Sequence, residues 1–192
     1  PGDVAALIAP SAPEGPHPMT EIMEDFERVV MPGITHWQHP RFFAYFPANA
    51  APPSMLAEML VSTIAAQCML WQTSPAATEM EAVMLDWLRQ AIGLPAQFSG
   101  VIQDSASSAT LAAVLTMRER ALNWQGNQAG LSGAVRLRIY CSAEVHTSVD
   151  RAIWVSGVGQ DNLVRIPIAG KRRGMDPVAL KAAIQADIAA GY

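Results

Sequence analysis

The first half of the chain has a hydrophobic pattern typical of helices. Apolar residues recur every three or four positions, which predicts three helices. These are one that contains Ile22 and Phe26 and ends at Pro32 and Gly33, one over residues 54–68, and one over residues 75–92. Residues 1–18, rich in Pro and Ala, predict an extended arm, and residues 35–53 predict an ordered loop rich in aromatic residues.

The second half alternates between helix and strand patterns. Apolar residues between Val135 and Ile139 alternate with arginines, as in a strand with one apolar face. The expected elements are a helix over residues 109–121, a strand over 135–141, a helix over 147–155, a strand over 163–168 and a helix over 176–190. This order predicts an α/β fold around a mostly parallel sheet. Arg118, Glu119 and Arg120 are expected to form a solvated helix face.

The composition narrows the classes of protein to which this chain could belong. Hydrophobic residues make up 51% of the chain and charged residues 16%, which is typical of a protein with a packed core. The net charge of −4, without a basic block, argues against a nucleic-acid partner. No apolar run suits a membrane span and no signal peptide is visible, although a chain that starts at Pro1 leaves a removed targeting segment open. Cys68 and Cys141 are expected to be buried thiols in a reducing compartment, which favours the cytoplasm.

Small polar residues at an expected helix start form the first candidate site. Residues 104–110 read DSASSAT, and side chains of this size let a ligand approach the backbone. Free N–H groups and the helix dipole favour an anion there, and serine hydroxyls add donors. Serines at such a position also cap helices, and this segment alone favours the simpler interpretation.

His146 follows the first expected strand, at the edge where open α/β sheets bind ligands. It could carry a proton, stack on a ring or bind a metal, whereas a lone histidine is more often structural. No cluster of Cys, His and Asp has the spacing of metal ligands, so no metal is expected. His36 and His39 are interpreted as residues that pack a loop.

The loop over residues 36–47, HWQHPRFFAYFP, is unusually rich in aromatic side chains. Three interpretations are open: a pocket for an aromatic substrate, a buried subunit interface, or ordinary core packing. The pattern alone does not choose among them.

Five short motifs follow one another along nearly the whole chain. They are MPGITHW (31–37), FFAYFP (42–47), SPAATEME (74–81) followed by WL (87–88), QDSAS (103–107) and HTSVDRA (146–152). In this order they resemble the group II pyridoxal-phosphate-dependent decarboxylases, specifically the branch of the aromatic-L-amino-acid decarboxylases.

The resemblance implies a type I, aminotransferase-like fold and a homodimer with a shared active site. It implies pyridoxal 5'-phosphate as cofactor and an L-amino acid, favoured to be aromatic, as substrate of a decarboxylation. By motif position, Ser105, Ala106 and Ser107 would hold the cofactor phosphate, and His146 would stack on the ring as the catalytic residue. The substrate pocket would include Trp37, Tyr45, Phe46, Pro47 and Met69.

The resemblance also implies how the chain is divided. Residues 1–93 would be an N-terminal arm and helical dimerisation segment, and residues 94–192 the first part of the large cofactor-binding domain. The two lysines, Lys171 and Lys181, do not lie in the family's cofactor-lysine motif. That lysine is therefore expected in a further C-terminal segment of the same protein.

Other activities on the same fold are alternatives to simple decarboxylation of an aromatic substrate, and one departure from the family pattern keeps a homologue without turnover among them. Ala48 stands where many aromatic decarboxylases carry Thr, so one hydroxyl contact is lost. An aromatic aldehyde synthase and a glutamate or histidine decarboxylase are alternatives on the same fold. A homologue that binds the cofactor without turnover is a less favoured alternative.

Overall fold

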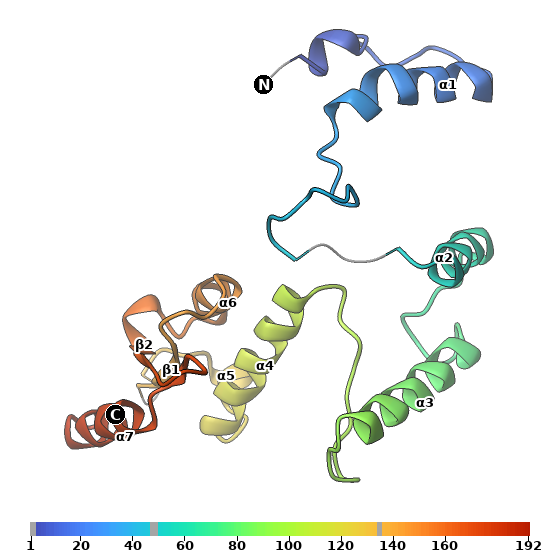
Figure 1. Ribbon diagram of the computed structural model, residues 1–192. Helices are drawn as coiled ribbons and strands as arrows, with labels where there is room; N and C mark the ends of the chain where they lie inside the picture. Colours follow the sequence, from blue (N-terminus) through green and yellow to red (C-terminus); the bar gives the residue numbers. More distant parts are fainter. Residues whose placement is uncertain (1–2, 47–49, 134–135) are drawn as a thin grey trace. The chain divides into compact units, whose positions relative to one another are not determined.

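The computed structural model describes residues 3–46, 50–133 and 136–192. The chain divides into two units, Pro1–Ala66 and Gln67–Tyr192. Figure 1 labels the main helices and strands of each. The domain boundary expected near Gly93 separates a dimerisation segment from the large domain. A single chain does not test this boundary, and it stays a prediction. No helix of the described residues is long and apolar enough to cross a membrane.

The first unit consists of helices joined by irregular segments. Its elements are a 3-10 turn at Ala5–Leu7, helix α1 at Met19–Asp25, a π-helical turn at Phe26–Val30, a 3-10 turn at Met31–Gly33, and helix α2 at Pro52–Ile64. The helical stretch that ends at Gly33 confirms the sequence pattern. Helix α2 ends earlier than expected, because Ala65 adopts a left-handed conformation with φ 49°, so the predicted extension to Cys68 was wrong.

The second unit carries the α/β part of the chain. Its helices are α3 (Pro75–Ala91), α4 (Ala106–Ala121), α5 (Gly126–Ala129), α6 (Ser148–Ser156) and α7 (Pro177–Ala189). Its strands are β1 (Ile139–Ser142), β2 (Leu163–Ile166), β3 (Ile168–Ala169) and β4 (Gly174–Met175). The expected strand over residues 163–168 is interrupted at Pro167, which has no N–H to donate, and β3 pairs with β4 in an antiparallel hairpin instead.

Strands β1 and β2 pair in parallel, as the element order predicted. Ile139 lies opposite Leu163, and Ser142 lies opposite Ile166. The strand expected from Val135 begins only at Ile139, where β2 is available to pair with it, and Val135 itself lies outside the described residues. Because both strands run the same way, their carboxyl ends lie at one edge of the sheet.

Helices α4 and α6 cover one face of this sheet. The buried core consists of Val114 of α4, Ala152 and Ile153 of α6, and Val158 after α6. Leu111, Leu137, Ile139, Val149 and Leu163 pack against this core from the helices and strands around it. The apolar residues of the predicted strand, Leu137 and Ile139, thus face α4 and α6.

Helix α7 lies on the other face and uses polar contacts. Asp187 of α7 accepts hydrogen bonds from Arg138 Nε at 3.2 Å and from the Tyr140 hydroxyl at 2.8 Å. The guanidinium groups of Arg136 and Arg138 lie 4.1 and 4.0 Å from the centre of the Tyr192 ring. Burial and the bond to Asp187 raise the pKa of Tyr140. The polar residues of the predicted strand therefore bind helix α7 and the residues that follow it.

The expectation of a solvated face at residues 118–120 was wrong for two of its three residues. Glu119 is only 3% exposed, and its carboxylate pairs with Arg118 at 2.7 Å. The same carboxylate accepts the backbone N–H of Asn127 at 3.0 Å. Helix α5 folds back to supply this donor, a contact between two helices that the pattern of α4 alone does not contain. Arg120 is exposed, as expected.

The two cysteines differ in their surroundings. Cys141 lies buried in β1, as expected, and burial raises the pKa of its thiol. Cys68 is exposed within its unit, because it lies beyond the end of α2 rather than on the face of a helix. The expectation that both thiols are buried therefore holds for Cys141 alone.

The core residue with the largest expected effect on stability is Ile153, which is 0% exposed. The substitution Ile153→Ala should lower the free energy of unfolding by about 2–5 kcal/mol, because it removes buried methyl groups and leaves a cavity. The matched control is Val155→Ala on the same helix, where the side chain is exposed and the change should stay within about 0.5 kcal/mol. Denaturant unfolding of both variants measures the difference, and equal losses would contradict the described core.

Candidate active site

The N-terminus of α4 presents unsatisfied backbone donors. Ser105 is the N-cap, and its Oγ accepts the N–H of Ser108 at 3.2 Å. The hydroxyls of Ser105 and Ser108 lie 3.1 Å apart. Within the described part of the chain, no acceptor is found for the N–H groups of Ala106 and Ser107, the first two residues of the helix. Ser105 therefore caps the helix, and two donors remain for an anion.

The segment before α4 is tethered to α3. The carboxylate of Glu81, on α3, accepts the N–H of Ile102 at 2.9 Å. This bond joins residues 21 positions apart and holds the chain just before Ser105. Glu81 is the last residue of the SPAATEME motif, so this motif contributes a side chain that positions the segment before α4.

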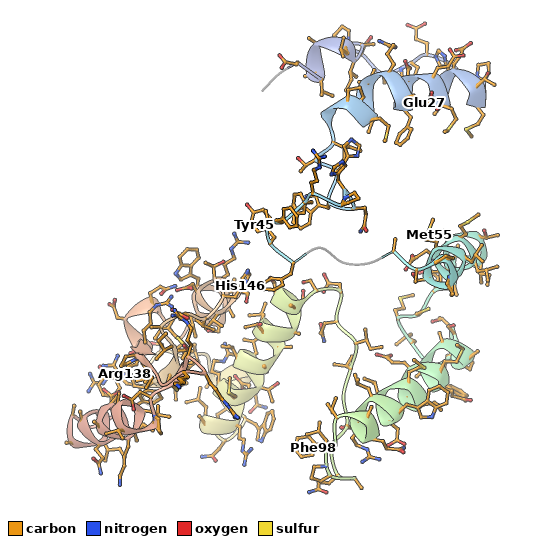
Figure 2. All side chains as sticks on the ribbon, viewed as in Figure 1. Glu27, Tyr45, Met55, Phe98, Arg138 and His146 are labelled. Carbon is orange, nitrogen blue, oxygen red and sulfur yellow. The ribbon has the colours of Figure 1, made fainter. Side chains whose placement is uncertain are left out.

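His146 lies in the loop that joins β1 to α6 (Figure 2). Its Nδ1 accepts the N–H of Ser148 at 3.1 Å, so a neutral ring carries its proton on Nε2. The loop itself is held at two points. Ala143 N–H donates to the Ile166 carbonyl at 2.8 Å, and Glu144 forms an ion pair with Arg173 of the β3–β4 hairpin. The imidazole is thus oriented by the backbone while its side chain is exposed.

The two helix starts lie at the same end of the unit. Arg118, near the end of α4, donates from Nη1 to the carbonyl of Ser156, the last residue of α6, at 2.6 Å. Val114 of α4 packs with Ala152 and Ile153 in the middle of α6. The helices therefore run in the same direction, which places the start of α4 and the loop with His146 at one edge.

The edge carries charges of both signs, since the exposed carboxylate of Asp104 directly precedes Ser105. Two helix N-termini contribute positive dipole ends. The nearest acid on α6, Asp150, is neutralised by Arg165 of β2 at 2.5 Å. Its carboxylate in turn raises the pKa of the Arg165 guanidinium. The donor set of backbone N–H groups and serine hydroxyls fits a phosphate, and the nearby imidazole fits an aromatic ring, so the residues present fit pyridoxal phosphate.

The residues expected to contact substrate lie in both units. In the first unit, the ring of Trp37 stacks on Phe42 at 5.0 Å and on Tyr45 at 5.4 Å between centroids. Tyr45 has a φ of 58°, a strained value for a residue with a side chain. Phe46 is 99% exposed, and Pro47 lies outside the described residues, as does Ala48. Met69 belongs to the second unit and is exposed.

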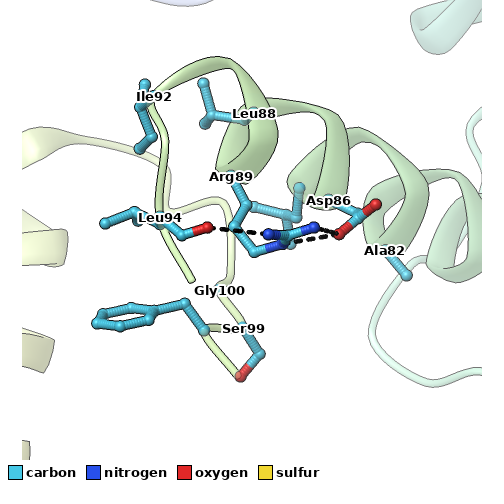
Figure 3. Close-up of a pocket in the computed structure, with 10 residues that line it drawn as sticks. Ala82, Asp86, Leu88, Arg89, Ile92, Leu94, Ser99 and Gly100 are labelled. Atoms are coloured by element: carbon cyan, nitrogen blue, oxygen red, sulfur yellow. Dashed lines mark hydrogen bonds and ion pairs between the residues drawn. The ribbon is translucent and has the colours of Figure 1, made fainter. Parts of the chain in front are cut away.

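A pocket of about 340 Å³ lies beside the C-terminal part of α3, and Figure 3 shows its lining. Its charged groups bind each other. Arg89 donates to Asp86 at 2.8 Å and to the Leu94 carbonyl at 2.9 Å. The hydrogen bonds from Arg89 and Gln90 lower the pKa of Asp86. None of the residues expected to form the site lines this pocket. Among the described residues, no group of three or more His, Cys, Asp and Glu could hold a metal ion.

These features define a class of protein: an α/β chain with unsatisfied N–H donors at a helix start and a histidine at the carboxyl edge of the sheet. The family model of the pyridoxal-dependent decarboxylase conserved domain matches residues 1–192, and the chain belongs to this family. It is 43% identical to the aromatic-L-amino-acid decarboxylase of Sus scrofa, covering 100% of this chain and 41% of that protein.

The solved structures agree with this assignment. The tryptophan decarboxylase of Catharanthus roseus, solved in complex with L-tryptophan, matches with a TM-score of 0.91 and 34% identity. The 4-hydroxyphenylacetaldehyde synthase of Rhodiola rosea matches with a TM-score of 0.90 and 32% identity. Both comparisons cover 100% of this chain and 42% of the other, so the chain spans about two fifths of the length of its relatives. The expected type I fold is thereby confirmed.

Proposed function

We propose that the protein to which this chain belongs is a pyridoxal-phosphate-dependent decarboxylase that converts an aromatic L-amino acid to its amine and CO₂. The observation that supports the proposal is that α4 and α6 start at the same edge of the unit, one with unsatisfied N–H groups and the other preceded by His146. The relatives support the substrate class, since one of them was solved with L-tryptophan.

The residues of this chain would bind and orient. The N–H groups of Ala106 and Ser107, with the hydroxyls of Ser105 and Ser107, would hold the phosphate. His146, fixed through Nδ1 by Ser148, would stack on the ring and set its plane. When bound, the cofactor would accept the electrons released as the carboxylate leaves. Trp37 and Tyr45 would provide an aromatic wall that excludes water from the substrate.

An aldehyde-forming reaction is the second candidate, because the synthase of Rhodiola rosea is a close structural match. The two reactions differ in their products. Simple decarboxylation yields amine and CO₂ without consuming O₂, whereas aldehyde synthesis consumes O₂ and water and yields the aldehyde, CO₂, ammonia and peroxide. Measuring amine, aldehyde and peroxide from one incubation separates the two.

We also infer a homodimer and a cytoplasmic location. Met55, Leu56, Met59 and Ile64 of α2 are all more than half exposed, and such a surface needs a protein cover. A second copy, together with the C-terminal part found in the longer relatives, would provide it. Sedimentation of the full-length protein measures the oligomeric state, and a stable monomer would contradict the dimer.

The phosphate subsite is tested by the substitution Ser107→Glu in the full-length protein. A carboxylate beside the free N–H groups should repel the phosphate and occupy its donors, so cofactor affinity should fall by at least about 100-fold. The control is Thr116→Glu, which adds the same charge to an exposed position further along α4. Cofactor binding is measured by absorbance titration of the apoprotein. If both variants bind the cofactor with equal affinity, the phosphate subsite does not lie at the start of α4.

A further inference from the structure

Arg118 connects three helices at the end of the unit opposite to the candidate site. Its Nε and Nη2 bind the carboxylate of Glu119 at 2.9 and 2.7 Å. Its Nη2 also donates to Oδ1 of Asn127 in α5 at 2.9 Å, and its Nη1 donates to the carbonyl of Ser156 in α6 at 2.6 Å. A single planar guanidinium therefore joins α4, α5 and α6, which a lysine with one point charge does not do.

The contact with α6 is made at a helix end and away from water. Ser156 is the last residue of α6 and is 1% exposed, and Gly157 follows it with a φ of 75°. The last carbonyls of a helix have no partner within the helix and carry the negative end of its dipole. A cation that donates to one of them is favourably placed. The partly buried position of Arg118 makes this bond an anchor rather than a surface contact.

This anchor sets how α4 and α6 are aligned along their common direction. Each helix is a stiff rod that rises about 1.5 Å per residue, so a shift at one end appears at the other. The far ends carry Ser105–Ser107 and the loop with His146. A cofactor with a phosphate at one end and a ring at the other needs these two places in register.

We propose that Arg118 is a positioning residue: by locking the ends of α4 and α6 together, it sets the register between the phosphate subsite and His146. This inference rests on the proposed function, because it assigns Arg118 a role toward the cofactor bound at that edge. Arg118 touches neither cofactor nor substrate in this account. It acts through the two helices.

The test compares Arg118→Met with Arg138→Met in the full-length holoenzyme. Arg138 is a matched control, since it is also partly buried and pairs with a helix carboxylate, Asp187, on the opposite face of the sheet. Both variants should lose stability. Arg118→Met alone should reduce the induced circular dichroism of bound cofactor at saturation and lower kcat by about 10- to 100-fold, as expected for misplaced groups.

A second pair of measurements distinguishes a changed alignment of α4 and α6 from damage to the phosphate subsite itself. Inorganic phosphate, measured by its competition with cofactor, should bind Arg118→Met and wild type equally, because the start of α4 is intact. Pyridoxal phosphate should bind the variant at least about tenfold more weakly, since its ring and phosphate no longer match two aligned sites. Arg118→Lys, which keeps the charge beside Glu119, should give an intermediate result and carries the test if Arg118→Met does not fold.

The inference is overturned if Arg118→Met and Arg138→Met have the same dichroism, the same cofactor affinity and the same kcat when folded. It is also overturned if phosphate and cofactor affinities fall together, because that pattern means damage to the subsite itself. Failure of the proposed function is a different result: wild type that binds cofactor with normal dichroism but forms no amine. In that case the dichroism and affinity comparison still decides the role of Arg118.

Discussion

The full-length variant His146→Ala should form amine about 10²- to 10⁴-fold more slowly than wild type, the range expected for loss of a positioned catalytic group. The backbone already orients this ring, since the Ser148 N–H donates to Nδ1. The ring is exposed and lies at the edge shared by the starts of α4 and α6. Alanine removes the stacking surface and leaves both helices in place, so kcat should fall far more than stability.

The control for this variant is His17→Ala. His17 is an exposed histidine that pairs with Glu21 at 3.0 Å in the first unit. Its loss should change neither kcat nor cofactor affinity. Assays at saturating cofactor distinguish slow turnover from poor loading. A His146→Ala enzyme with near-normal turnover would remove His146 from the site.

The second large effect is expected at Glu119. The substitution Glu119→Ala should lower the free energy of unfolding by about 3–5 kcal/mol, because it leaves the largely buried guanidinium of Arg118 without its carboxylate. It also removes the acceptor for the Asn127 N–H. The site is tightly packed: a methyl group added at Gly126 would collide with the Glu119 carboxylate. Without the Glu119 carboxylate, Arg118 keeps only its neutral acceptors, Asn127 Oδ1 and the Ser156 carbonyl.

Asp25→Ala provides the comparison for this prediction. Asp25 pairs with Arg28 at 2.6 Å, but its side chain is 66% exposed, so its loss should change stability by no more than about 1 kcal/mol. Denaturant unfolding of the full-length variants gives both values. If the two losses are equal, the carboxylate of Glu119 is solvated and the described network is absent.

Features set by local sequence were the most predictable. Helix α7 begins where Asp176 and Pro177 indicated, since the Asp176 carboxylate accepts the N–H groups of Val178 and Ala179 at 2.8 and 3.3 Å. Helices α3 and α6 lie within one residue of their expected bounds. In each case the local residues that indicate the helix in the sequence also stabilise it in the structure.

Features set by distant partners were not predictable in the same way. The start of β1 depends on where β2 pairs with it, so the strand pattern from Val135 overstated its length. The burial of Glu119 depends on Asn127, which α5 brings back to it. The left-handed turn at Ala65 carries no glycine or asparagine that would have indicated the end of α2.

The candidate site also has features that local sequence predicts and features that depend on distant partners. The position of His146 after a strand was evident from sequence, because a strand end is a local feature. The small polar residues at the start of α4 were also evident, but the helix begins at Ala106, three residues before the expected bound. The tether from Glu81 to Ile102 and the anchor from Arg118 to Ser156 were missed, since each joins residues more than 20 positions apart. The SPAATEME motif contained Glu81, but only the structure gives its partner.

The most direct test of the central claim is product analysis of the full-length protein with pyridoxal phosphate and aromatic L-amino acids. We expect CO₂ and the corresponding amine in equal amounts, with no peroxide, and no product when the cofactor is omitted. Carboxyl-labelled substrate measures the CO₂, and chromatography measures the amine. Aldehyde with peroxide in place of amine would contradict the proposed reaction, and binding of the cofactor with no product from any amino acid would contradict catalysis.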